Sequence, residues 1–155
     1  MFYFQSAILC HDQVVSAGDF YCLVLDFYPG GNLCDMIGNQ DNHKLSEELS
    51  RAFFRQIISG IGHLHNKKII HRDIKLENIL LDKSQTKLAI GDFGLSSLWD
   101  PSAKLRTRCG SAEVTPPQRL VHPSLQYAAP EIYDRQSVYT QAVDMWSVGV
   151  SLYAM

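Results

Sequence analysis

The sequence predicts a fold of the α+β class, in which helices and short strands occupy separate stretches of the chain. A run of β-branched and aromatic residues, FYCLVLDF at 20–27, ends in the turn-forming letters YPGGN. Apolar residues recur every three or four positions at 46–65, as on one face of a helix. Short apolar pieces then precede a second, strongly apolar helix at 141–155.

The composition of the 155-residue chain is that of a globular protein of one domain. Hydrophobic residues make up 46% and charged residues 19%, and 14 basic against 16 acidic residues leave a net charge of -2. This near balance gives no strong attraction to nucleic acid or to an anionic membrane, and we expect neither partner. The apolar start MFYFQSAIL lacks basic residues and soon becomes polar, so no targeting or membrane segment is predicted.

The cysteines are scattered along the chain and form no Cys-x-x-Cys pair. This spacing predicts neither a zinc ribbon nor a dithiol redox motif. Reduced cysteines are typical of the cell interior, so we expect an intracellular, cytoplasmic protein. The residues concerned are Cys10, Cys22, Cys34 and Cys109.

The first predicted helix is amphipathic and has a recognisable start. Ser46 is a suitable N-cap, and Glu47 and Glu48 lie in the first turn, where acidic side chains favour the positive end of the helix dipole. Gly60 and Gly62 lower the helix propensity near its end, so propensity alone does not hold that end. The face expected in the core consists of Leu49, Phe53, Ile57, Ile61 and Leu64.

The remaining elements are predicted from short apolar runs. The run at 20–27 is predicted to be a buried strand that leads into a turn. The pieces KKII, NILLD and KLAIGDFG are predicted to be small strands around loops, with DKSQ as a hairpin-like turn. The tail at 141–155 is predicted to be a buried helix because nearly all of it is apolar.

The chemistry is concentrated in HRDIKLENILL at 71–81. An acid in a loop beside a lysine and an asparagine suits phosphoryl transfer, which depends on positioning and on neutralising charge. Asp73 can orient a hydroxyl nucleophile and accept its proton, and Lys75 can neutralise the phosphoryl group. The oxygen of Asn78 suits Mg²⁺, and Asp92 in DFG is the second expected metal ligand.

These residues resemble the eukaryotic protein kinases through four motifs in the family's order, HRDIKLEN, DFG, AAPE and DMWSVGV. The resemblance covers nearly the whole chain, and Lys75 is typical of the serine/threonine type. It implies a protein-kinase-like fold, mainly the helical C-terminal lobe and truncated at both ends, with ATP and a protein substrate as reactants. The implied partial kinase domain has a small-lobe remnant at 1–25, a hinge at 26–32 and a partial large lobe at 33–155.

The same resemblance assigns further residues to binding and to support. It implies that Asn78 and Asp92 hold Mg²⁺. Asp144 is similar to the family's buried aspartate that holds the catalytic-loop backbone, and Glu131 to the acid that anchors the end of the activation segment. The residues implied for ATP are Leu25 as gatekeeper, Asp26 and Tyr28 in the hinge, Asn32, and Leu80 beneath the adenine ring.

A regulatory site is implied by LRTRCGS at 105–111, which is similar to the group of calcium/calmodulin-dependent and AMP-activated kinases. Thr107 is then the phosphorylation site of an upstream activating kinase. Its phosphate would add a charge of about -1.5 to -2 facing Arg72, whose planar guanidinium can pair with it. This pairing would order the surrounding segment.

Two features of the sequence depart from the family. No glycine-rich loop or V-A-I-K-like lysine precedes residue 20, and we therefore expect negligible phosphoryl transfer by the isolated chain. The second departure is AEVTPPQRLVHPS at 112–124, an insertion between two intact halves, predicted to be an exposed loop or translated intron. The alternatives to an active kinase are a pseudokinase-like binding module, an inactive kinase fragment and an incomplete gene model.

Overall fold

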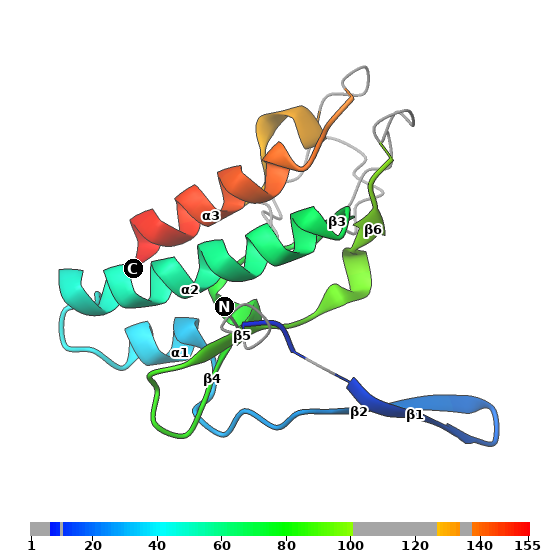
Figure 1. Cartoon of the computed structure of the whole chain (residues 1–155). Helices are drawn as coiled ribbons and strands as arrows, with labels where there is room; N and C mark the ends of the chain where they lie inside the picture. Colours follow the sequence, from blue (N-terminus) through cyan, green and yellow to red (C-terminus); the bar gives the residue numbers. More distant parts are fainter. Residues whose placement is uncertain (1–6, 10, 101–126, 134–137) are drawn as a thin grey trace, which may run out of the picture.

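The computed structural model describes residues 7–9, 11–100, 127–133 and 138–155, and it confirms the α+β class. Two long helices lie side by side, and the described strands form three antiparallel pairs, β1–β2, β3–β6 and β4–β5 (Figure 1). The helices are α1 (Leu33–Gly38), α2 (Glu47–Asn66) and α3 (Ala142–Ala154). The strands are β1 (His11–Ala17), β2 (Phe20–Leu25), β3 (Ile69–Ile70), β4 (Ile79–Leu81), β5 (Leu88–Ile90) and β6 (Ser97–Leu98).

Helix α2 forms where the spacing of apolar residues predicts it. The Ser46 hydroxyl oxygen accepts a hydrogen bond from the Leu49 backbone N–H at 3.3 Å, which satisfies one of the unpaired donors at the helix start. Four of the five predicted core residues are buried, and Leu49 packs against the same cluster. Their burial against α1, β4 and β5 forms the main hydrophobic core, because apolar area removed from water stabilises the folded chain.

The turn predicted at DKSQ joins β4 to β5. Asp82 holds it, because its side-chain oxygens accept hydrogen bonds from the backbone N–H groups of Thr86 and Lys87 and from the Ser84 hydroxyl. Gln56 on α2 reaches the same hairpin, donating to the Thr86 carbonyl at 3.0 Å and accepting from the Leu88 N–H at 3.1 Å. This contact fixes the hairpin beneath α2.

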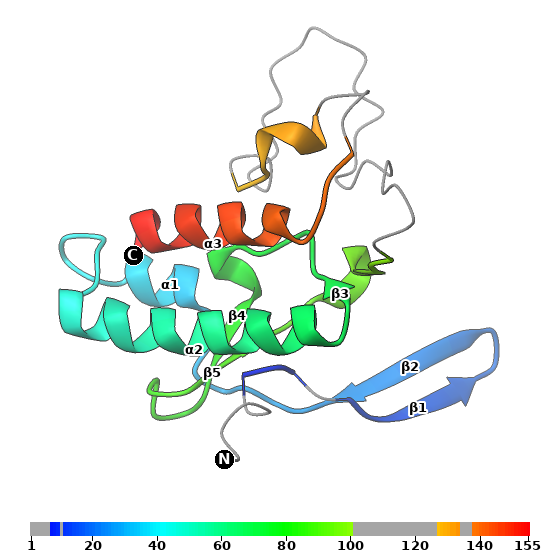
Figure 2. The ribbon, with the colours of Figure 1, turned by 45° about the horizontal axis from the view of Figure 1, so that its top comes forward.

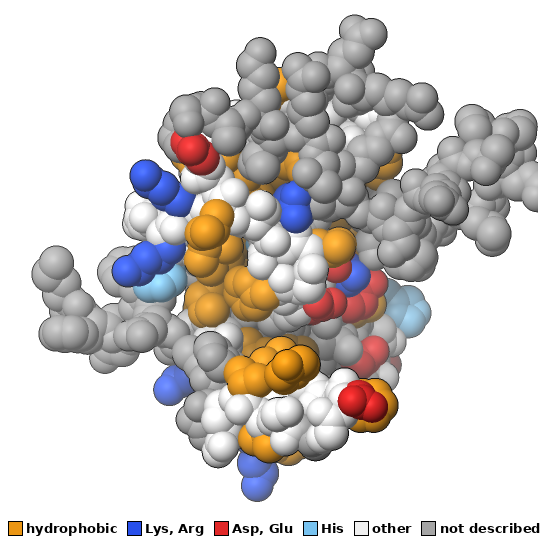
Figure 3. Space-filling model, turned by 90° about the vertical axis from the view of Figure 1, so that its right-hand side faces the viewer, with side chains coloured by type: hydrophobic (Ala, Val, Ile, Leu, Met, Phe, Trp, Pro, Cys, Tyr) orange, Lys and Arg blue, Asp and Glu red, His pale blue; other side chains and the backbone are white. Residues whose placement is uncertain are grey.

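The prediction that the run at 20–27 is buried is wrong, although β2 is a strand. Strands β1 and β2 form a hairpin that projects away from the two long helices (Figures 1 and 2). Every residue of β2 is exposed, including Phe20 at 74% and Tyr21 at 80%. Hydrophobic side chains reach the surface on that side of the molecule (Figure 3). Among the described strands, β2 is hydrogen-bonded to β1 alone.

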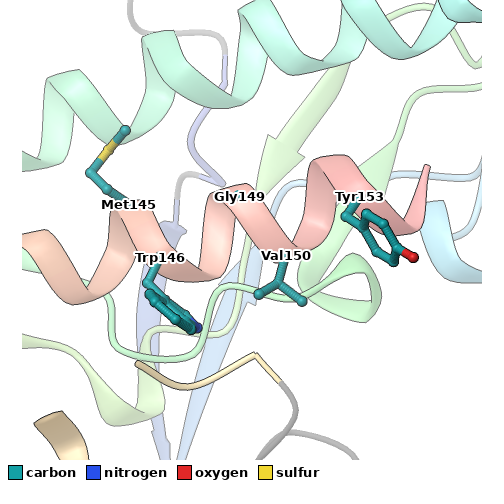
Figure 4. A pocket seen from close by; sticks show the side chains of 5 residues that line it. All are labelled: Met145, Trp146, Gly149, Val150 and Tyr153. Carbon is teal, nitrogen blue, oxygen red and sulfur yellow. The ribbon is translucent and has the colours of Figure 1, made fainter. Parts of the chain in front are cut away.

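Helix α3 is buried on one face and exposed on the other, whereas the sequence predicted a buried helix. Val143, Asp144, Ser147, Val148 and Ser151 face the interior. A shallow cavity of about 370 Å³ lies along the other face (Figure 4). The side chains lining it are Met145, Trp146, Val150 and Tyr153, together with Gly149. A nearly continuous run of apolar residues therefore does not distinguish a helix that is buried on every side from one that is buried on a single side.

Among the described residues, no helix is both long enough and apolar enough to span a membrane. Thr107 and the apparent insertion at 112–124 lie outside the described residues.

Candidate functional site

The HRDIKLEN loop runs from β3 to β4, and its histidine, His71, is fully buried. The backbone N–H of Asp73 donates to His71 Nδ1 at 3.3 Å, and His71 Nε2 lies 2.9 Å from the Gly91 carbonyl oxygen. Burial lowers the pKa of His71 below its usual value of 6.5. A neutral ring with its proton on Nε2 satisfies both contacts. His71 thus ties the loop to the strand end that precedes Asp92.

The buried Asp144 of α3 holds the backbone of the same loop. Its carboxylate accepts hydrogen bonds from the N–H of His71 at 3.0 Å and from the N–H of Arg72 at 2.8 Å. His65 Nε2 lies 2.8 Å from Oδ2 of this carboxylate. Arg72 has a φ of 68°, a left-handed conformation that a residue with a Cβ adopts only when its surroundings hold it. Asp144 thus holds the backbone of the HRDIKLEN loop at His71 and Arg72.

Asp73, Lys75 and Asn78 converge within the loop. Lys75 Nζ lies 2.8 Å from Asp73 Oδ2, and Asn78 Nδ2 donates to the same oxygen at 3.0 Å. Asn78 Nδ2 also donates to the Asp73 backbone carbonyl at 2.8 Å. The carboxylate is thereby fixed through Oδ2, and within the described residues Oδ1 takes no hydrogen bond. This leaves one oxygen of Asp73 available to a hydroxyl group.

Asn78 and Asp92 are neighbours through the backbone, although 13 residues separate them in sequence. The Gly91 N–H donates to the Asn78 carbonyl at 2.9 Å, and Asp92 follows with a φ of 58°. Because Nδ2 of Asn78 donates to Asp73, the amide oxygen of Asn78 points away from Asp73, and within the described part of the chain it makes no hydrogen bond that would keep it from a cation. An amide oxygen and a carboxylate suit Mg²⁺, which usually takes only one or two protein carboxylates and completes its shell with water and phosphate.

The residues assigned to ATP lie at the end of β2, between β2 and α1, and on β4. An isolated antiparallel bridge brings Asn32 beside Leu80. The backbones approach so closely there that a Cβ on Gly30 would lie 2.1 Å from the Asp82 carbonyl oxygen. Asn32 is also the N-cap of α1, since its side chain accepts from the Asp35 N–H at 2.8 Å. Its contact with ATP stays a prediction.

A mostly apolar cavity of about 690 Å³ lies between the N-terminal segment, β2, the end of α2 and the DFG residues. Leu25 and Asp92 both line it, whereas Leu80, Asp26 and Tyr28 do not. The structure therefore brings Leu25, the predicted gatekeeper, and Asp92, a predicted metal ligand, to a common cavity. Apolar walls with a few polar groups are typical of small-molecule sites.

Two residues of the site escaped the sequence interpretation. The Tyr139 hydroxyl accepts a hydrogen bond from Arg72 Nη1 at 3.1 Å, and His65 contacts Asp144. These pairs are 67 and 79 residues apart, so no local pattern marks them. Glu131 lies half-buried in a short 3₁₀ turn, Pro130–Ile132, and its anchoring role stays a prediction, as does the pairing of Arg72 with Thr107.

The family model described as "Protein kinase domain" matches residues 4–155. The chain is 37% identical over 156 residues to "Protein kinase kin1" of Schizosaccharomyces pombe, covering 97% of this chain and 16% of that protein. It is 39% identical over 143 residues to the "Carbon catabolite-derepressing protein kinase" of Saccharomyces cerevisiae, covering 92% and 20%. The human "Hormonally up-regulated neu tumor-associated kinase" is 37% identical over 146 residues, covering 92% and 18%. The chain thus spans at most a fifth of the length of these relatives.

Proposed function

The chain belongs to the protein kinase family, and we propose that it supplies the catalytic loop for transfer of phosphate from ATP to serine or threonine of a protein substrate. One observation carries the proposal. Asp73 is held through Oδ2 by Lys75 and Asn78, which leaves Oδ1 to meet a substrate hydroxyl. A carboxylate in that position orients the hydroxyl and accepts its proton during transfer.

The residues around Asp73 have separate tasks in this proposal. Lys75 stays beside the carboxylate and places a positive charge where the phosphoryl group would pass. Asn78 and Asp92 would hold Mg²⁺, which, when bound, neutralises phosphate charge. Asp144 and His71 keep the loop backbone in place, so that Asp73 does not have to be ordered during the reaction.

We also propose an intracellular, cytoplasmic location and activation by an upstream kinase. Cys22 and Cys34 are free cysteines, which supports a reducing compartment. The sequence around Thr107 supports the activating kinase through its resemblance to the regulated group.

A hybrid protein tests the function. This chain, without residues 112–124, replaces the matching segment of the yeast carbon catabolite-derepressing protein kinase, which supplies the regions on either side. We expect the hybrid to transfer radiolabelled phosphate from ATP to serine or threonine peptides. Asp73→Asn should lower the rate by about 100-fold or more, because it removes the proton acceptor. Asp41→Asn, at an exposed position, is the matched control.

The same experiment distinguishes the alternatives. A hybrid that folds and binds ATP with Mg²⁺, yet transfers nothing to any peptide, would indicate a noncatalytic binding module. One observation favours that second candidate, namely the exposed apolar hairpin β1–β2, because large exposed apolar patches often contact partners. The 155-residue chain alone is expected to show negligible transfer.

A further inference from the structure

The side chain of Arg72 joins three segments that are distant in sequence. Its Nε donates to the Leu95 carbonyl at 2.5 Å, and its Nη2 donates to the Ser96 carbonyl at 3.4 Å. Its Nη1 donates to the Tyr139 hydroxyl oxygen at 3.1 Å. Each nitrogen of the guanidinium thus has one partner, and the partners come from two segments, residues 95–96 and Tyr139.

We propose that Tyr139 is a positioning residue whose hydroxyl fixes the orientation of the Arg72 guanidinium, and through it the backbone that follows Asp92. The two carbonyl contacts both come from the adjacent residues Leu95 and Ser96, and alone they would leave the guanidinium free to rotate about this pair of hydrogen bonds. A third contact on Nη1 removes that freedom, since a planar guanidinium held at all three nitrogens has one orientation. The inference deepens the proposed function. Its expected effect on phosphoryl transfer rests on that proposed function, whereas the contact of Tyr139 with Arg72 does not.

Tyr139 is itself held firmly enough to act in this way. Its side chain is 4% exposed and belongs to a small buried cluster with Ile70, Ala129, Ile132 and Val143. Ile70 immediately precedes the HRDIKLEN loop, and Val143 lies in the first turn of α3. The ring is therefore packed against both elements that meet at Arg72. A close-packed ring presents its hydroxyl at a nearly constant position.

The position of Tyr139 in the chain strengthens the inference. Asp144, five residues later, accepts the backbone N–H of Arg72 at 2.8 Å. Arg72 is thus held twice, by its backbone through Asp144 in the first turn of α3 and by its side chain through Tyr139 just before this helix. Because Arg72 has a φ of 68°, a second restraint on the side chain helps to keep the residue in that unfavourable conformation.

The Arg72 contacts also reach the predicted metal ligand. Leu95 is the last residue of the 3₁₀ turn Phe93–Leu95, which has Asp92 as its N-cap and Ser96 as its C-cap. Asp92 accepts from the Gly94 N–H at 3.3 Å, inside the same turn. A guanidinium that holds the end of this turn therefore limits the movement of Asp92. Three of the five guanidinium N–H groups are used, so within the described residues two remain for an anion.

The test is hydrogen exchange at the Arg72 side-chain Nε–H, followed by NMR in the full 155-residue chain. Tyr139→Phe removes one oxygen and keeps the packed ring. We expect it to speed exchange at Arg72 Nε by about tenfold, because the side chain opens more often. Tyr153→Phe is the matched control, since Tyr153 is on α3 but is 94% exposed, and exchange should then change less than about twofold.

Two results would overturn the proposal. Equal exchange at Arg72 Nε in Tyr139→Phe and in the unaltered chain would show that the hydroxyl does not hold the guanidinium. Lost protection of the α2 backbone amides in Tyr139→Phe would show that the hydroxyl supports the fold instead. Neither result depends on phosphoryl transfer. In the hybrid kinase, Tyr139→Phe should lower kcat about fivefold and leave the KM for peptide within about twofold, a split that a general loss of folded protein does not produce.

Discussion

Asn78 donates two hydrogen bonds from one nitrogen to Asp73, to its backbone carbonyl at 2.8 Å and to its carboxylate at 3.0 Å. Asp73 lies in a loop, whereas Asn78 ends the short 3₁₀ turn Leu76–Asn78 and is only 8% exposed. The amide therefore fixes the main chain and the side chain of Asp73 at once. The same residue is thus suited to two tasks, orienting the acid by its nitrogen and offering its oxygen to a cation.

Asn78→Ala should lower the free energy of unfolding by about 1–3 kcal/mol. The change leaves a partly buried Asp73 carbonyl without its donor, and an unsatisfied buried acceptor costs about that much. Urea unfolding followed by circular dichroism measures the effect. Asn42→Ala, at an exposed position, is the matched control, and an equal small loss in both variants would contradict the role given to Asn78.

Asp144→Asn should be the most destabilising single-atom exchange in the site, by about 3 kcal/mol or more. Both carboxylate oxygens accept from backbone N–H groups, so the new amide NH₂ must face a donor in either orientation. Hydrogen bonds to a charged group are worth about 1.5–3 kcal/mol each, and two are affected. Urea unfolding measures the loss, and the amide exchange rates of His71 and Arg72 should rise with it.

The exposed Asp41→Asn variant gives the comparison for Asp144. An Asp144→Asn chain as stable as that control would show that these hydrogen bonds contribute little.

Local patterns predicted the elements well because their causes are local. The cap at Ser46, the apolar face of α2 and the turn at Asp82 each depend on residues a few positions apart, and the structure confirms all three. The burial of β2 was predicted wrongly, because the burial of a strand depends on the elements packed against it, which the amino-acid sequence of the strand does not specify. The contact of Tyr139 with Arg72 arises only after α3 packs, so the sequence did not show it.

His71 makes stability depend on pH in a defined direction. Burial lowers its pKa in the folded chain below 6.5, so under more acidic conditions the unfolded chain binds a proton that the folded chain does not. The free energy of unfolding should therefore fall as pH drops below about 6.5, by up to about 1.4 kcal/mol per pH unit from this residue. Urea unfolding at a series of pH values measures the slope.

His71→Gln should make the dependence of the free energy of unfolding on pH less steep, because the residue that takes up the extra proton in the unfolded chain is gone, whatever the effect on absolute stability. An NMR titration checks the cause directly, since the midpoint of the His71 ring signals should lie below 6.5. Ring signals that titrate with a midpoint near 6.5 would rule out the lowered pKa.

Two glycines near the end of α2 should respond in opposite directions to alanine. At Gly62 an added Cβ meets no atom within 4 Å, so Gly62→Ala should stabilise the chain by about 0.5–1 kcal/mol through helix propensity. At Gly60 the same Cβ would lie 2.9 Å from Ile90 Cδ1 and 3.2 Å from the Ala7 carbonyl oxygen. Ile90 is fully buried in β5, so its Cδ1 cannot move away without disturbing the core packing. The Ala7 carbonyl accepts the Ile90 N–H at 2.9 Å, so its oxygen cannot move away without weakening this hydrogen bond.

Gly60→Ala should therefore destabilise the chain by about 1–3 kcal/mol, because overpacking outweighs the gain in propensity. The two variants add the same methyl group to the same helix two positions apart, so their difference isolates the contact with β5 and the N-terminal segment. Thermal and urea unfolding measured side by side give that difference. Equal stabilisation in both variants would mean that residues 7–9 do not pack against α2 in solution. The close approach of Ala7 and Ile90 to Gly60 would then contribute nothing to the stability of the core.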